Sequence, residues 1–203
     1  MTELPWKPVI YLPVDLTVRF GADVLTVDDP GPWCQRKAAE LLRPAADPKQ
    51  VSRLVRCLAE YAAHFRSKRL PTTAALFFWP DFTRIPPRGE AQIYIVGEDP
   101  VIGPMTLSRG REICGPDERS FGETEMTETD VPAGSALRVH RFRKAEPGKR
   151  RSPIGEELVW IIWPPGSTAI VSMATRWMEP MFSKAGISIA DDMANNFRIE
   201  PKA

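Results

Sequence analysis

Histidine and cysteine are scarce in this chain: of its 203 residues, two are histidine and three are cysteine. Cys34, Cys57 and Cys114 are widely spaced and form no Cys-x-x-Cys pair, which argues against both a structural zinc site and a disulfide framework. A few widely spaced cysteines without a pairing pattern fit a reducing compartment best, so we expect a cytoplasmic protein.

The short motifs of common catalytic and nucleotide-binding sites are also missing. The sequence has no Gly-x-Ser-x-Gly, no Gly-x-Gly-x-x-Gly and no loop ending in Gly-Lys-Ser/Thr. The pair Cys57 and His64 lies seven residues apart on one expected helix, which separates the two side chains by roughly 10 Å, too far for proton transfer. The acidic pairs at 28–29 and 191–192 are explained as helix caps. We therefore expect no catalytic residues, no metal and no cofactor.

Excess charge and long apolar runs are absent as well. The formal net charge is +1, which gives no general attraction to phosphate or to anionic lipid. The longest uncharged apolar run, at 158–163, is far shorter than the roughly 20 residues that cross a bilayer. The first residues, "MTELPWKPVIYLPVDL", do not have the pattern of a signal peptide. We expect neither specific nucleic-acid binding nor membrane insertion.

Proline is abundant instead, at 21 residues, and it separates short periodic segments. The spacing of apolar residues and the turn signals predict helices at 33–42, 48–68, 105–113 and 188–196. They predict strands at 9–12, 16–20, 23–27, 73–79, 92–96, 158–163 and 168–173. We expect hairpins at 16–27, with its turn at 20–23, and at 158–173. We expect Ser188 to cap the last helix, with Asp191 and Asp192 in its first turn.

The apolar pattern of the strands indicates a sheet that is covered on both sides. Alternate residues of a strand face opposite sides, so the run 160–163, Trp-Ile-Ile-Trp, makes both faces apolar. Frequent hairpins favour antiparallel pairing. We therefore predict an α+β fold: a three-layer α/β/α sandwich with a mainly antiparallel central sheet, formed by residues 1–203 as a single domain.

This order of elements resembles the PsbP-like superfamily, an α/β/α sandwich shared by a photosystem II subunit and a nuclear import factor that releases nucleotide from Ran. The segments that carry the resemblance are the early hairpin, "KQVSRLVRCLAEYAAHF", "AALFFWPDF", "LVWIIWPPGSTAIVSM" and "ISIADDMANNF". The resemblance lies in spacing and topology. It implies a scaffold that mostly binds partners, and it assigns a role to no individual residue.

Two neighbouring segments carry opposite charge. Segment 117–130 holds six acidic residues against Arg119, whereas segment 131–152 is rich in lysine and arginine. A hairpin over 122–143 that turns at 131–135 would neutralise much of this charge across its strands. The expected pairs are Glu128 with Arg138, Glu125 with Arg141, and Glu123 with Arg143. Beyond the arms, a basic loop remains as a possible interaction site or as a solvated connection: Lys144, Lys149, Arg150 and Arg151.

The six tryptophans are more simply explained by core packing than by a ligand site, with Trp177 as the one to examine. Two functions remain open. The first is a non-enzymatic protein-interaction or accessory module, cytoplasmic and bacterial, that binds an unidentified protein through its loops and sheet rim. The second is a small-ligand-binding protein or enzyme with a pocket at the sheet edge, formed by Arg176, Trp177 and His140.

Overall fold

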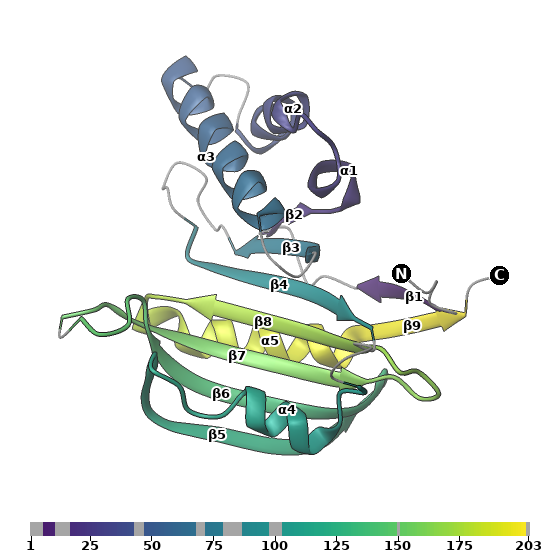
Figure 1. The fold of residues 1–203 in the computed structure, drawn as a ribbon. Helices are drawn as coiled ribbons and strands as arrows, with labels where there is room; N and C mark the ends of the chain where they lie inside the picture. The colour runs from purple at the N-terminus through teal and green to yellow at the C-terminus, as the bar shows by residue number, and fades with distance from the viewer. Residues whose placement is uncertain are drawn as a thin grey trace.

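The structure is a computed structural model, and it describes residues 6–10, 17–42, 47–67, 72–78, 87–97, 103–149 and 151–201. Most strands form one seven-stranded sheet in which every neighbouring pair is antiparallel (Figure 1). In spatial order these strands are β2 (Thr17–Phe20), β3 (Thr72–Phe78), β4 (Gly89–Val96), β8 (Ile170–Trp177), β7 (Ile154–Trp163), β6 (Gly134–Lys144) and β5 (Ser120–Val131). The predicted antiparallel sheet is confirmed.

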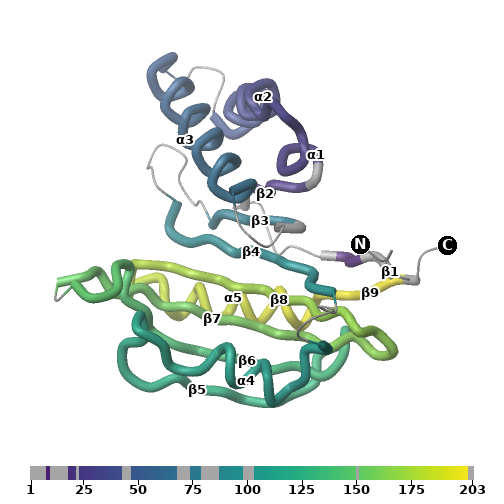
Figure 2. The backbone as a smooth tube through the Cα atoms, in the orientation of Figure 1, coloured from purple at the N-terminus to yellow at the C-terminus, as the bar shows by residue number. Residues whose placement is uncertain are grey.

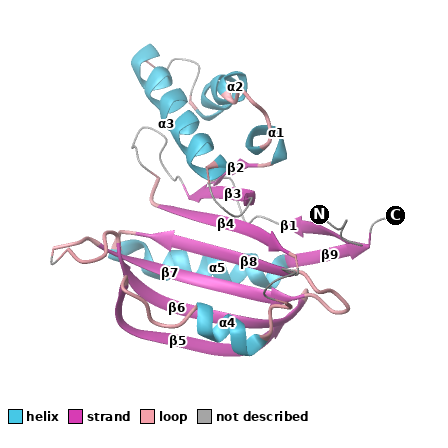
Figure 3. Cartoon of the chain, viewed as in Figure 1, coloured by secondary structure: helices cyan, strands magenta, loops and turns pink. Residues whose placement is uncertain are grey.

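Helices cover both faces of this sheet, as the alternation of apolar residues predicts. They are α1 (Ala22–Leu25), α2 (Gly31–Leu41), α3 (Pro48–Arg66), α4 (Leu107–Ile113) and α5 (Ser183–Asn196), with a short 3-10 helix η1 (Pro180–Phe182) before α5. On β3, Leu76 and Phe78 belong to the core under α5, whereas Ala75 and Phe77 belong to the core under α1–α3. Helix α4 packs over β6 and β7 (Figure 3). The α+β class with helices on both faces is confirmed.

Two strands from opposite ends of the described chain form a separate small sheet. β1 (Trp6–Ile10) pairs antiparallel with β9 (Phe197–Pro201), so Ile10 lies opposite Phe197 (Figure 2). Phe197 is fully buried and belongs to the core under α5. The predicted strand at 9–12 is therefore confirmed over 9–10, whereas 11–12 lie outside the described residues. Strand β9 was not predicted. No helix in the described ranges has the length and apolar character that crossing a bilayer requires.

The predicted hairpin at 16–27 is wrong. Residues 23–27 do not return as a strand, because the chain coils into α1 directly after β2 and β2 pairs with β3. The amide N–H groups of Val24 and Leu25 both donate to the Gly21 carbonyl, which closes this turn of helix. Val24 is fully buried there, so packing under the helices outweighs the β-propensity of "DVLTV".

The predicted start of the last helix is also wrong. Helix α5 begins at Ser183, so Ser188 lies inside it and caps nothing. Asp191 lies in the middle of the helix, where it accepts hydrogen bonds from the guanidinium of Arg138, at 2.9 and 3.1 Å, and from the indole N–H of Trp160, at 3.2 Å. Its carboxylate therefore ties α5 to the sheet.

The charged hairpin forms as predicted, but the predicted charge pairs are wrong. β5 and β6 are joined by a two-residue turn, Pro132 and Ala133, which shifts the register by one residue from the expected one. Glu128 consequently lies opposite Leu137, and such a shift moves a side chain to the other face. The observed ion pairs join Glu128 to Arg111, Arg138 to Asp191, Arg141 to Glu157, and Arg143 to Asp117 and Glu157.

Candidate functional site

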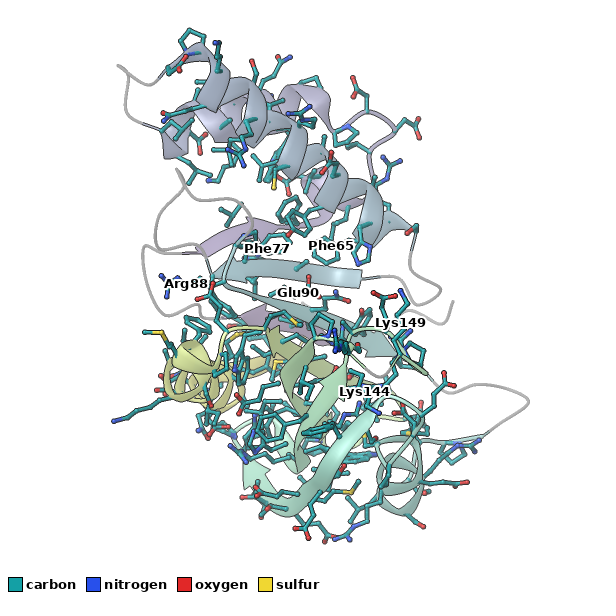
Figure 4. The ribbon with its side chains drawn as sticks, turned by 90° about the vertical axis from the view of Figure 1, so that its left-hand side faces the viewer. Phe65, Phe77, Arg88, Glu90, Lys144 and Lys149 are labelled. Carbon is teal, nitrogen blue, oxygen red and sulfur yellow. The ribbon has the colours of Figure 1, made fainter. Side chains whose placement is uncertain are left out.

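One end of the sheet gathers several strand ends and the start of α5. β4 begins there at Gly89, and β8 ends there at Trp177, directly opposite Gly89. β7 begins and β6 ends at the same place, with Ile154 opposite Lys144. Figure 4 looks onto this end of the molecule, where Arg88, Glu90 and Lys144 are labelled. Two pockets lie there, and both are lined by Gly155 and Glu156 at the start of β7.

The larger of these two, which we name the apolar pocket, has a volume of about 450 Å³. It is lined by Phe121, Phe142, Ile154, Gly155, Glu156, Trp177, Met178, Glu179, Pro180 and Ser183. Its rim is unusual because four large apolar side chains are exposed there: Phe121 by 48%, Phe142 by 42%, Ile154 by 38% and Met178 by 49%. The part of the chain that the structure describes has six such exposed side chains, and four of the six lie on this rim. One of the other two, Met181 at 93%, belongs to η1 beside the pocket.

A bulge in β5 brings the two phenylalanines of the rim together. The pairing of β5 with β6 shifts between Phe121 and Thr124, and Gly122 adopts φ 76° at this point, a backbone conformation that favours glycine. Phe121 then lies opposite Phe142, on the same face of the sheet. The "SFGE" sequence in an otherwise alternating strand thus places an aromatic pair at the mouth of the pocket.

A buried carboxylate fixes the floor of the apolar pocket. Glu156 is 6% exposed and accepts hydrogen bonds from the indole N–H of Trp177, at 2.7 Å, and from the hydroxyl of Ser183, at 2.9 Å. The Nε2 atom of His140 lies 2.7 Å from the same carboxylate, and its Nδ1 atom lies 3.5 Å from Glu125. Three elements are thereby locked around one side chain, which makes the floor rigid.

This arrangement differs from a catalytic serine site. In a nucleophile relay, the histidine stands between the hydroxyl and the acid and takes the proton of the hydroxyl. Here the carboxylate of Glu156 stands between Ser183 and His140, and the hydroxyl donates to the carboxylate. The contacts orient the three side chains and give Ser183 no histidine base.

The second pocket, which we name the polar pocket, has a volume of about 300 Å³ and adjoins the first. It is lined by Arg119, Arg143, Lys144, Ala145, Gly155, Glu156, Glu157, Arg176, Trp177 and Met178. Glu157, one of these residues, is only 2% exposed and accepts hydrogen bonds from Arg176 at 2.5 Å and from Arg141 at 2.6 Å. Burial raises the pKa of Glu157, but the charges of Arg176 and Arg141 outweigh burial, so the pKa is lowered overall.

The structure joins two of the three residues expected to form a pocket. His140 and Trp177 both contact Glu156, beneath the apolar pocket. Arg176 faces the opposite side of the sheet, where it binds Glu157 and lies 3.7 Å from Glu90, because neighbouring residues of a strand alternate between faces. Glu156 and the rim phenylalanines were missed, since only the fold shows that they meet.

The basic residues of the expected interaction loop are placed in different ways. Lys144 is the last residue of β6 and lines the polar pocket. Lys149 forms an ion pair with Glu146 within the loop, and Arg151 is exposed. Arg150 lies outside the described residues. The role of this loop as an interaction site stays a prediction.

No family model matches the chain, and no curated protein matches it either. A solved structure that it resembles is LpqN of Mycobacterium tuberculosis, described as involved in cell envelope biogenesis. The two chains are 11% identical, the match covers 98% of this chain and 88% of LpqN, and the TM-score is 0.47. This similarity concerns the general fold and says nothing about what this chain binds. The PsbP-like resemblance stays a prediction.

Proposed function

We propose that the protein is a non-enzymatic, cytoplasmic interaction module that binds another protein by taking a large apolar side chain of that partner into the apolar pocket. The observation that carries this proposal is the clustering of exposed apolar side chains. Phe121, Phe142, Ile154 and Met178 surround one pocket, although the rest of the described surface exposes few side chains of this kind. An apolar patch gathered around a hollow is typical of an interaction site.

The chemistry of the pocket suits a protein partner. Aromatic side chains around a well-packed hollow are the usual surroundings of an interface hot spot. Met178 and Met181 add unbranched, polarizable side chains that adapt to different partner shapes. The floor is already fixed by the contacts of Glu156, so little conformational entropy is lost there when a partner binds.

The predicted relation to the PsbP-like superfamily is part of this proposal. Its support is the order of α3, β3, the β7–β8 hairpin and α5, which follows four of the five segments that carry the resemblance. The fifth, the early hairpin, does not form. A scaffold that mostly binds partners agrees with a site that offers contact surface and no nucleophile–base pair.

One observation favours a second candidate, a small-ligand-binding protein. The apolar pocket, at about 450 Å³, falls within the range of small-molecule sites. A small apolar compound would occupy the same hollow and rest on Trp177. The two candidates therefore predict different occupants for one site.

Selection from a displayed library of random peptides tests the first candidate. We expect the selected peptides to share a large apolar residue, and the double variant Phe121→Ser/Phe142→Ser to lose their binding. The matched control is Ile113→Ser, which replaces an exposed apolar residue of α4 outside this rim and should keep binding.

A thermal-shift screen of metabolites tests the second candidate. A ligand present at a hundred times its dissociation constant adds about 2.7 kcal/mol to the stability. If no peptide is selected and a metabolite raises the melting temperature of the native protein but not of the double variant, the site binds a small molecule and the first candidate is wrong.

A further inference from the structure

The polar pocket adjoins the apolar pocket and carries a surplus of positive charge. The two pockets share Gly155, Glu156, Trp177 and Met178, so a ligand seated in one lies beside the other. Four cationic side chains line the polar pocket, against two carboxylates. Both carboxylates are buried and already hydrogen-bonded by protein donors. The exposed part of this pocket is therefore cationic.

Two of these cations are available to a ligand. Arg143 and Arg176 are held by Glu157, but Arg119 and Lys144 have no ion pair within the described part of the chain. The two residues are neighbours, because the amide N–H of Lys144 donates to the Arg119 carbonyl at 2.7 Å.

These cations also lie next to the rim of the apolar pocket. Lys144 is directly opposite Ile154, which places it on the same face of the sheet as that rim residue. Arg119 immediately precedes β5, two positions before Phe121. An acidic group attached close to a buried apolar group would therefore meet both cations.

The nearby acidic groups do not cancel this charge. Asp117 is paired with Arg143, Glu146 with Lys149, and Glu179 with Arg88. Glu118 is exposed in the same turn and forms no ion pair with any of the described residues, so one carboxylate stands against the two cations.

We infer that the partner is an acidic segment: it places a large apolar side chain in the apolar pocket and an adjacent carboxylate against Lys144 and Arg119. This inference rests on the proposed function and adds the charge of the partner to it. A carboxylate bound by ammonium and guanidinium groups makes charge-assisted hydrogen bonds, which are stronger than neutral ones. Complementary charge also makes binding selective and sensitive to salt.

The test uses three fluorescent peptides of glycine and serine, acetylated and amidated at their ends, with a central phenylalanine flanked by Asp, Asn or Lys. Binding to the full chain is followed by fluorescence polarisation at 50 and 300 mM salt. We expect the Asp-Phe peptide to bind about tenfold more tightly than the Asn-Phe peptide, and the Lys-Phe peptide most weakly. Raising the salt concentration should weaken the binding of the Asp-Phe peptide and of neither other peptide.

The variant Arg119→Ser/Lys144→Ser should remove the preference for Asp over Asn and leave the Asn-Phe peptide unaffected. The matched control, Lys49→Ser/Arg53→Ser, removes two exposed positive charges from α3 and should keep the preference. Melting temperatures of all variants show whether the fold is intact.

The outcomes separate the two proposals. If Asn-Phe binds as tightly as Asp-Phe at both salt concentrations, the acidic partner is wrong and the interaction pocket stands. If none of the three peptides binds, both proposals fail. If dodecanoate displaces Asp-Phe and binds more tightly, the site recognises a small amphiphilic carboxylate, and the assignment to a peptide is overturned.

Discussion

Replacing Glu157 with Gln should destabilise the protein strongly, because it leaves several arginines without their common partner. The carboxylate is 2% exposed and accepts from Arg141 and Arg176, with Arg143 at 3.4 Å. An amide keeps the shape of the side chain but removes the charge. Arg141, whose second contact is the Cys114 carbonyl at 2.9 Å, would then be a buried cation without a counter-charge.

The expected magnitude follows from this burial. Breaking a buried ion pair by removing one partner costs about 3 to 5 kcal/mol. This is a large share of the roughly 5 to 15 kcal/mol that stabilises a typical domain. With an m-value of about 2 kcal/mol/M in urea, the unfolding midpoint should fall by about 1.5 to 2.5 M.

Dependence on pH gives a second test of the same reasoning. The pKa of Glu157 is lower in the folded protein than in the unfolded chain. Its contribution to stability is therefore complete above the unfolded value of about 4.3, and it is lost as the pH falls through the lower folded value. The difference between native protein and variant should stay constant from pH 7 to 5 and shrink below about pH 4.

Urea unfolding followed by tryptophan fluorescence measures both effects. The control is Glu128→Gln, which breaks the exposed ion pair with Arg111 and should cost less than about 1 kcal/mol. If Glu157→Gln costs no more than this control, or if its effect stays unchanged at pH 3, the network does not stabilise the fold in the way described.

Three further predictions concern the backbone, the thiols and the basic loop. Gly134→Ala should destabilise the protein by about 2 kcal/mol or more, because Gly134 has φ 140° and an added Cβ would lie 2.1 Å from the Trp163 carbonyl oxygen. The control Gly97→Ala, where an added Cβ meets open space, should be nearly neutral when both variants are compared by urea unfolding. Burial raises the pKa of Cys57 to about 11 and also raises the pKa values of Cys34 and Cys114. A disulfide reagent at pH 8 should therefore react with the three thiols quickly in urea and slowly in the native protein, and a fast reaction of the native protein would contradict this. Replacing Lys149, Arg150 and Arg151 with Ser should leave the melting temperature unchanged, and binding to mixed oligonucleotides should disappear near physiological salt; submicromolar binding at 0.2 M salt that this variant loses would show a true nucleic-acid site.

The elements that the sequence predicts well are those whose own pattern decides their structure. Helix α3 begins at Pro48 after its cap Asp47, which accepts from the Lys49 amide, and it buries Leu54, Leu58 and Phe65 as the spacing requires. The β7–β8 hairpin is likewise marked by two apolar runs around a turn. In these segments the apolar periodicity and the turn residues predict the same structure, so tertiary contacts alter the local secondary structure little.

The elements that were missed depend on distant partners. β9 pairs with β1, and its five residues, "FRIEP", alternate apolar and polar over too short a run, directly after α5, to mark a strand by themselves. The start of α5 was placed too late because Ser188 has the appearance of a cap, although the Ser183 hydroxyl binds Glu156. Of the site residues, Trp177 could be singled out from the sequence as the tryptophan to examine. The role of Glu156 was not visible in the sequence, because its donors come from other elements.

The pairing of β1 with β9 has a consequence for synthesis on the ribosome. Ile10 leaves the ribosome early, but Phe197 is made only when almost all of the described chain has been translated. At about 5 to 20 residues per second, β1 waits roughly 10 to 40 s for its partner. Phe197 also completes the core under α5, so that side of the sheet stays uncovered in the nascent chain for the same period. A ribosome that stalls before residue 197 would therefore hold a chain with an unpaired strand and an open core, the state in which chaperone binding or aggregation competes with folding.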